Sequence, residues 1–344
     1  MKRIISFALM FVMILATTSF ADANTNSINE CKIKSCEWMK YIPDSAPIVE
    51  LNIPGTHNAA CCYFHSVPYK YGKLVVSTSV MAPFAKTQSL SIPKQFNIGV
   101  RTMDIRIALV KETDNYLTVP HNMTITADKR NQGCKMKIET VINYAEDFVK
   151  KHPSETVIII YSRDGRTYDT SSDKFLRLEK QLDDSFKNNP NRIYLESGMK
   201  SPTMKEARGK VILMANSQYE GAINTGLDLD GCALKGSVRY KYAKQYFDKT
   251  VTQNYDSEGI LTKGQGINSR PLGINTSARG EINESGDHYI LNPLGIPFPK
   301  DNAKEMNSRL MKYKFKKGNY YGWFASDFVT EKLCRRIYLL NKFE

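Results

Sequence analysis

The chain has 344 residues, of which 42% are apolar, so it can bury the core of one large domain and is not a disordered chain. Its 48 basic and 35 acidic residues give a formal net charge of +13, which suits anionic partners such as acidic lipid surfaces or phosphates. The basic residues are scattered, apart from a group at 312–317, and accompany no nucleic-acid-binding motif. Nucleic acid is therefore not an expected partner.

The first residues indicate export. Lys2 and Arg3 form a basic start, residues 4–15 are an apolar run too short to span a bilayer comfortably, and small residues follow at 19–23. This order predicts a signal peptide over residues 1–23 and a secreted, extracellular domain over 24–344. The alternative is an uncleaved anchor. No later stretch is long and apolar enough for a transmembrane helix.

Seven cysteines follow the predicted cleavage site. Export permits disulfides, and an odd count leaves at least one thiol unpaired or paired between chains. Cys31 and Cys36 are close enough in sequence for a local disulfide, but the connectivity stays open. No C-x-x-C pair occurs, so a zinc site is not expected.

Six apolar, β-branched runs end at polar residues, and such continuous runs are typical of strands buried on both faces. They cover residues 48–53, 100–110, 117–119, 156–161, 210–214 and 321–324. Amphipathic patterns between them predict helices over 137–151, 172–186 and 302–313. Strands that alternate with helices predict an α/β fold, a single barrel of the TIM type. Residues 261–299, rich in Gly and Pro, are predicted to form a long loop.

Catalytic groups of such a barrel lie at the carboxyl ends of its strands. His57 and His121 each follow an apolar run and a turn that contains proline, with Asp104 and Arg106 between them in sequence. Two imidazoles can serve as general base and general acid near neutral pH, and an arginine can hold the oxygens of a phosphate. A strand-end histidine alone is more often structural. The combination favours cleavage of a phosphodiester.

Six segments resemble, in order, the motifs of the phosphatidylinositol-specific phospholipase C X-domain family. They are residues 53–58 (IPGTHN), 99–106 (GVRTMDIR), 119–121 (VPH), 154–160 (SETVIII), 209–213 (GKVIL) and 321–328 (YGWFASDF). The resemblance runs from about residue 48 to 335. It implies a distorted (β/α)8 barrel that cleaves phosphatidylinositol, or glycosyl-phosphatidylinositol anchors, to diacylglycerol and inositol 1,2-cyclic phosphate.

The same resemblance implies the catalytic roles. His57 is the expected base, oriented by Asp327, and His121 is the expected acid. Arg106 would stabilise the phosphate, with Asp104 supporting the site. Asn58 stands where bacterial members usually carry an aspartate that partners the acid. A neutral amide can orient His121 but cannot favour its protonated form as a carboxylate would.

Further positions concern the substrate and the metal. Substrate-binding positions of the family fall on Ser162, on the neighbouring Arg163, on Asn216 and, as the ring that stacks on inositol, on Tyr242. Eukaryotic members bind Ca²⁺ through carboxylates at the positions of Asp104, Arg106 and Ser162. Because Arg106 and Ser162 stand at two of these positions, we expect neither a metal nor another cofactor.

Two alternatives stay open. One is a metal-dependent phosphodiesterase that acts on another phospholipid, which would use clustered Glu and Asp ligands. The other is a catalytically impaired lipid-binding protein, which is suggested by Asn58, Asn216 and Tyr240 at positions where the family carries charged residues. In each case the expected partner is a phosphoinositide-containing membrane or a lipid substrate, and the protein is expected to be a monomer.

Overall fold

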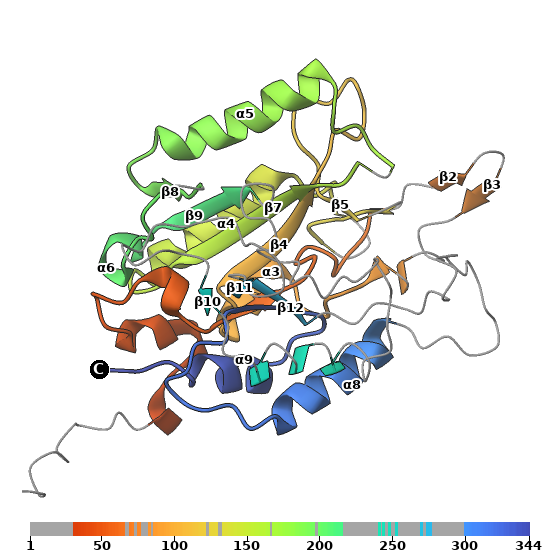
Figure 1. The fold of residues 1–344 in the computed structure, drawn as a ribbon. Helices are drawn as coiled ribbons and strands as arrows, with labels where there is room; N and C mark the ends of the chain where they lie inside the picture. The colour runs from red at the N-terminus through yellow and green to blue at the C-terminus, as the bar shows by residue number, and fades with distance from the viewer. Residues whose placement is uncertain are drawn as a thin grey trace, which may run out of the picture.

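A computed structural model gives the fold shown in Figure 1. It describes residues 30–65, 69–71, 74–76, 82–83, 85–121, 124–129, 133–165, 167–196, 199–215, 240–241, 243–244, 247–248, 252–253, 269–270, 273–276 and 299–344. The predicted signal peptide lies outside these residues. In the described part, no helix has both the length and the apolar character needed to cross a membrane.

A parallel sheet of seven strands forms the centre, in the order β12-β13-β1-β4-β7-β9-β8. Its strands are β1 (Ile53–Thr56), β4 (Thr102–Ile107), β7 (Val157–Arg163), β8 (Arg192–Tyr194), β9 (Val211–Ala215), β12 (Gly273–Thr276) and β13 (Trp323–Ser326). Three two-stranded pairs lie outside it: β2 (Tyr69–Tyr71) with β3 (Leu74–Val76), β5 (Pro120–His121) with β6 (Thr124–Ile125), and β10 (Thr252–Gln253) with β11 (Ser269–Arg270).

Helices surround the sheet. They are α3 (Ile92–Asn97), α4 (Ile138–Lys151), α5 (Asp173–Lys187), α6 (Met204–Ala207), α8 (Pro299–Lys312) and α9 (Glu331–Tyr338). Three short 3-10 helices precede β1: η1 (Glu30–Lys32), η2 (Ser35–Tyr41) and η3 (Ile48–Glu50). Parallel strands with helices packed outside them form an α/β fold of the barrel type, as the alternating pattern predicts.

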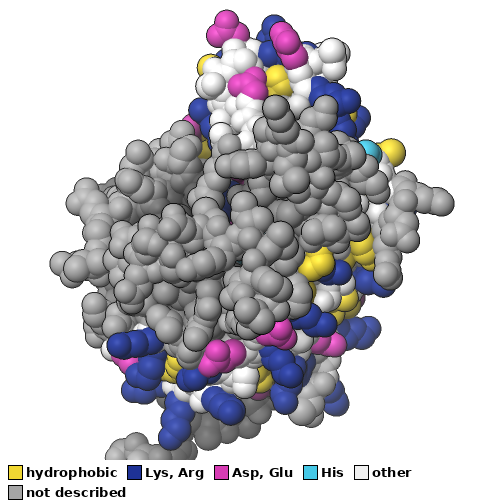
Figure 2. All heavy atoms as spheres, turned by 90° about the vertical axis from the view of Figure 1, so that its right-hand side faces the viewer, with side chains coloured by type: hydrophobic (Ala, Val, Ile, Leu, Met, Phe, Trp, Pro, Cys, Tyr) yellow, Lys and Arg dark blue, Asp and Glu magenta, His cyan; other side chains and the backbone are white. Residues whose placement is uncertain are grey.

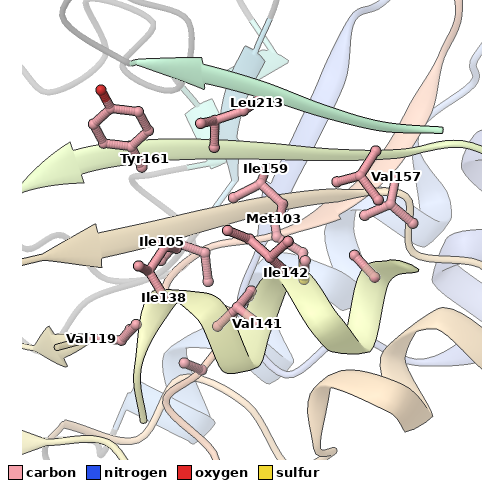
Figure 3. Close-up of a cluster of buried hydrophobic side chains, with 14 of the residues drawn as sticks. Met103, Ile105, Val119, Ile138, Val141, Ile142, Val157, Ile159, Tyr161 and Leu213 are labelled. Atoms are coloured by element: carbon pink, nitrogen blue, oxygen red, sulfur yellow. The ribbon is translucent and has the colours of Figure 1, made fainter. Parts of the chain in front are cut away.

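Side chains of β7 and β9 alternate between two cores. Met103, Ile105 and Ile159 face outward and pack against Val141 and Ile142 of α4 (Figure 3). A second core, on the other face, joins residues of β1, β7, β9 and β13 with buried residues of η2 and η3, including Ile158, Ile160, Ile212, Met214, Trp38 and Met39. The N-terminal 3-10 helices therefore pack on the inner face of the strands.

The strand and helix predictions agree with the structure within a few residues, with two exceptions. Residues 48–50 form η3 rather than a strand, because Pro47 begins a 3-10 turn in which the amide of Leu51 donates to the carbonyl of Ile48. Residues 261–299 are not only a loop, since they contain β12, which pairs with β13 in register Gly273 to Trp323. The short β12 carries too few apolar residues to stand out in the sequence.

Candidate active site

Six predicted residues come together at the carboxyl ends of neighbouring strands. His57 and Asn58 follow β1, Asp327 follows β13, Asp104 and Arg106 lie in the second half of β4, and His121 ends β5. Adjacent parallel strands bring these ends to one edge of the sheet, which explains why residues far apart in sequence meet there. The spatial order of β13, β1 and β4 sets Asp327 and Arg106 on either side of His57.

His57 is fixed on both sides of its ring. The side chain is buried, and Nδ1 lies 2.8 Å from Oδ1 of Asp327, which is also buried. A carboxylate accepts hydrogen bonds, so this contact places the proton of the neutral imidazole on Nδ1 and leaves Nε2 with its lone pair. Nε2 then accepts a hydrogen bond from Nδ2 of Asn58 at 2.9 Å. The arrangement suits a general base.

His121 is held in the same tautomer by a different partner. Its Nδ1 lies 2.9 Å from the carbonyl oxygen of Ala85, so Nδ1 carries the proton. Its Nε2 lies 3.1 Å from Nδ2 of Asn58. The ring is half-buried, whereas His57 is almost wholly buried. A single amide group therefore contacts Nε2 of both histidines.

The orientation of that amide follows from Arg106. Nε of Arg106 donates to Oδ1 of Asn58 at 3.2 Å, so Oδ1 faces the guanidinium and Nδ2 faces the two rings. The backbone amide of Asn58 donates to Oδ2 of Asp104 at 3.1 Å. Oδ1 of Asp104 lies 3.5 Å from Nε of Arg106. Arg106 thus occupies the space between the two oxygen-bearing side chains.

Ser162 and Arg163 lie on opposite faces of β7. Arg106 pairs with Ser162 in the register of β4 and β7, so both face the inner side. Among the described residues, the buried Oγ of Ser162 has no hydrogen-bond partner. Arg163 points outward instead, where Nε donates to Glu179 of α5 at 2.8 Å. Of the two substrate-binding predictions on β7, the structure brings only Ser162 to the cluster. Asn216 and Tyr242 lie outside the described residues.

Residues 85–88, which the sequence did not single out, connect the parts of the site. Besides Ala85, this segment contains Thr87, whose hydroxyl donates to the carbonyl of Asn58 at 3.0 Å. Nε2 of Gln88 donates to the carbonyls of His57 and Ser326, both at 2.9 Å. Residues 85–88 therefore bond to the loops after β1 and β13 and to β5. Their short polar sequence carries no motif, so only the fold could reveal this role.

The backbone beside both members of the His57–Asp327 pair adopts an unusual conformation. Asn58 has φ of 43° and Phe328 has φ of 46°, in the left-handed region that bulky residues rarely adopt. The amide of Phe328 donates to the carbonyl of Thr87, and Asn307 donates to the carbonyl of Asp327, at 2.7 and 2.9 Å. Such conformations persist where surrounding bonds enforce them and cluster at functional sites.

The buried Cys61 near the site behaves as a structural residue. Cys61 is buried close to Asp104 and Asp327, and its burial, reinforced by these charges, raises the pKa of the thiol well above its usual value. It therefore stays protonated and behaves as a core residue.

A polar cavity of about 970 Å³ lies at the end of the sheet opposite to the candidate active site. It is lined by Leu51, Asn52 and Tyr321 among others. It contains none of the predicted site residues.

The described cysteines do not form disulfides. Cys36, Cys61, Cys62, Cys134 and Cys334 are free thiols in the structure, and Cys134 is exposed. The local disulfide that the spacing of Cys31 and Cys36 allows is therefore absent from the structure. The side chains of Cys31 and Cys232 lie outside the described residues.

This fold is that of bacterial phosphatidylinositol-specific phospholipases C. The enzyme structure from Listeria monocytogenes matches with a TM-score of 0.59 at 20% identity, over 90% of this chain and 100% of that one. A mutant of the Staphylococcus aureus enzyme matches with a TM-score of 0.60 at 17% identity, over 90% of this chain and 98% of that one. These similarities confirm the prediction of a distorted α/β barrel.

Sequence comparisons agree with the fold. Residues 73–217 match the profile of the phosphatidylinositol-specific phospholipase C X domain, a range that includes Arg106 and His121 but not His57 or Asp327. The 1-phosphatidylinositol phosphodiesterase of Staphylococcus aureus (strain Newman) is 25% identical over 238 residues, 62% of this chain and 66% of its own. The 1-phosphatidylinositol phosphodiesterase of Listeria monocytogenes is 26% identical over 207 residues, which cover 60% of this chain and 57% of that protein. Residues 73–217 are therefore similar to the X domain of phosphatidylinositol-specific phospholipases C. The matches to the two phosphodiesterases span 66% and 57% of the length of these relatives, less than two thirds of each.

Proposed function

We propose that the protein is a secreted phosphodiesterase that cleaves phosphatidylinositol, or glycosyl-phosphatidylinositol anchors, to diacylglycerol and inositol 1,2-cyclic phosphate without a metal. One observation carries the proposal: Nε2 of His57 and Nε2 of His121 face the same amide nitrogen, with Arg106 bonded to the same side chain. A base, an acid and a cation are the groups that an intramolecular attack on phosphorus requires.

The first step uses His57. Its Nε2 takes the proton of the inositol 2-hydroxyl, and that oxygen attacks phosphorus. The imidazolium that forms is stabilised by Asp327, 2.8 Å from Nδ1, and both groups are buried where such a charge pair is strong. The hydroxyl would take the place that Nδ2 of Asn58 occupies beside Nε2.

The second step uses His121. Protonation of the glycerol oxygen requires a proton on Nε2 of His121, but Nδ2 of Asn58 is a donor and lies 3.1 Å from that atom. The acid form therefore requires the amide to move, or to turn its oxygen towards His121 and leave Arg106. A substrate phosphate that binds Arg106 would release the amide oxygen for this purpose.

Arg106 would stabilise the non-bridging oxygens and replace a metal ion. Its side chain is 23% exposed, so a ligand can reach it, and its Nε lies 3.2 Å from Asn58 and 3.5 Å from Asp104. These two side chains supply oxygens of the kind that Ca²⁺ prefers. A tethered guanidinium in contact with both supports the proposal of a metal-independent reaction.

The surface charge supports a membrane substrate. The chain has a net charge of +13, and Lys and Arg side chains gather along the lower part of the face in Figure 2. This is the right-hand side of Figure 1, towards which β5 and the β2–β3 pair lie and along whose lower part α8 runs. A basic surface near a lipid substrate attracts anionic headgroups.

The test is an assay on phosphatidylinositol vesicles in EDTA, with cyclic inositol phosphate followed by phosphorus NMR. We expect product from the wild type and a loss of at least about 10³-fold in His57→Ala, since general base catalysis and the buried pair act together. His152→Ala is the matched control, because His152 follows α4 at the other end of the sheet. It should keep full activity.

Other outcomes separate the alternatives. Activity only after Ca²⁺ or Mg²⁺ is added would favour a metal-dependent phosphodiesterase. Binding to vesicles without turnover, unchanged in His121→Ala, would identify a lipid-binding protein. Equal product from His57→Ala and the wild type would refute the proposed mechanism.

A further inference from the structure

Cys36, Glu37 and His152 lie together at the amino end of the sheet, away from the candidate active site. Their ligand atoms, Sγ, a carboxylate oxygen and a ring nitrogen, lie within 4.8 Å of one another, and each residue is half-buried. In the described part of the chain, these three form the one group of potential metal ligands. We propose that they bind a divalent transition-metal ion of the Zn²⁺ type.

The geometry is close to what Zn²⁺ requires. Tetrahedral Zn²⁺, with bonds of about 2.0 to 2.3 Å, holds its ligand atoms about 3.3 to 3.8 Å apart. Nδ1 of His152 lies 3.6 Å from Oε1 of Glu37, within that range. The side chains of these two residues are 22% and 37% exposed, so small rotations can bring the remaining atoms to the same spacing.

The donor types select the ion. A thiolate and an imidazole favour Zn²⁺ and other borderline or soft metals, whereas Ca²⁺ and Mg²⁺ require sets of oxygen ligands. Three protein ligands leave a fourth position for water. His152 caps the carboxyl end of α4, where the helix dipole favours a cation.

One buried ion pair holds together the two segments that form the site, one with Cys36 and Glu37 and the other with His152. Arg101 and Glu155 have no exposed side-chain surface, and Nη2 of Arg101 lies 2.7 Å from Oε2 of Glu155. The pair contacts the backbone on both sides of Cys36 and Glu37: Arg101 donates to the carbonyl of Ser35, and Glu155 accepts from the amide of Met39.

The same pair also reaches the histidine. The amide of Glu155 donates to the carbonyl of His152 at 2.9 Å, and the ring of Phe148 lies 4.7 Å from the ring of His152. The backbone segments that carry the ligands are therefore fixed relative to each other before any ion arrives, which lowers the entropic cost of binding. The separation of Cys36 from His152 along the chain explains why cysteine spacing gives no zinc signal.

Cys36 differs from the other described cysteines. Burial raises the pKa of the thiols of Cys61, Cys62 and Cys334, for Cys334 to about 12, so these three behave as core residues. Cys134 is exposed and belongs to no such group. Cys36 is half-buried, and its Sγ lies within 4.8 Å of the ligand atoms of Glu37 and His152.

The experiment measures Zn²⁺ binding by calorimetry on the reduced, mature protein and Co²⁺ binding by absorption. We expect one Zn²⁺ per chain, a thiolate-to-cobalt charge-transfer band, and a melting temperature raised by about 5 °C when Zn²⁺ is 100-fold above its dissociation constant. Cys36→Ser should abolish the band and weaken Zn²⁺ binding at least tenfold. Cys134→Ser is the matched thiol control and should change neither.

His152→Ala and Glu37→Gln keep the test decisive if Cys36→Ser does not fold, since each should weaken Zn²⁺ binding while the thiol remains. The proposal is overturned by a wild type that binds no Zn²⁺, by binding that these variants leave unchanged, or by a disulfide at Cys36 in the purified protein. Phosphodiesterase activity should not change with Zn²⁺, so this test is independent of the proposed function.

Discussion

Arg101 and Glu155, at the amino end of the sheet, form an ion pair without exposed side-chain surface, whereas the charged groups at the carboxyl end are only partly paired. Arg101 donates to the backbone carbonyls of Phe96 and Val100 as well as to Glu155. At the other end, Oδ1 of Asp104 and Oγ of Ser162 are buried without a hydrogen-bond partner among the described residues.

The two ends of the sheet therefore use their charged groups differently. At the amino end the charges hold the backbone, and at the carboxyl end they are available for chemistry. The predictions below test this division in order of expected effect.

The largest loss is expected from Asp327→Asn. An amide can donate to Nδ1 of His57 and thereby move the ring proton to Nε2, which removes the base. We expect kcat to fall about 10³- to 10⁴-fold with little change in KM. Asp184→Asn, in an exposed pair with Lys180 on α5, is the control and should keep wild-type kinetics. A fall of less than tenfold would show that Asp327 does not set the tautomer of His57.

A substitution at the amino end of the sheet should lower the stability of the protein rather than its activity. Glu155→Ala leaves the Arg101 guanidinium buried without its partner, which costs about 3 to 5 kcal/mol in the free energy of unfolding. Urea unfolding measures this value. Glu305→Ala removes a partner from an exposed pair with Arg309 and should change stability little. If both substitutions changed the free energy of unfolding equally, the buried pair at the amino end would have no special role in stability.

Arg106 and Arg163 provide a matched pair of arginines. Arg106→Lys keeps the charge but loses the planar fork and the bond to Asn58, so activity on phosphatidylinositol should fall about 100-fold. Arg163→Lys changes a side chain that pairs with Glu179 on the outer face and should stay within about twofold of the wild type. Similar losses from both would place Arg163 in the site, as the sequence alone suggested.

The sequence predicted the parts of the molecule in which local pattern and tertiary structure agree. The apolar runs that became β4, β7 and β9 are buried on both faces, so their composition alone indicates a parallel sheet. The amphipathic pattern of α4 predicted its position within one residue. Histidines and carboxylates at the ends of such strands could be located because parallel strands share one functional edge.

The remaining features depend on contacts between distant segments. Nothing in residues 85–88 indicates that Ala85 bonds to the end of β5, or that Gln88 bonds to the end of β13 and to the residue after β1. The opposite directions of Ser162 and Arg163 follow from strand register, which pairs Ser162 with Arg106. Likewise, the sequence showed that Asn58 replaces a charged residue, but not that its amide contacts both histidines.

The smallest and most informative change is Asn58→Asp. A carboxylate in this position accepts a hydrogen bond from a protonated Nε2, whereas Nδ2 of the present amide opposes one. The acid form of His121 should then persist to higher pH, and the protonated form of His57 should persist as well, because Asn58 contacts both rings. We expect both limbs of the pH–rate profile to move to higher pH by about one unit, with kcat above neutrality raised up to about tenfold.

Aspartate tolerates the left-handed backbone of this position, so the fold should be kept. Asn58→Ala, which removes both contacts, is the comparison: if Asn58→Asp gave the same profile as Asn58→Ala, the amide would be a spacer and would not control the proton on His121.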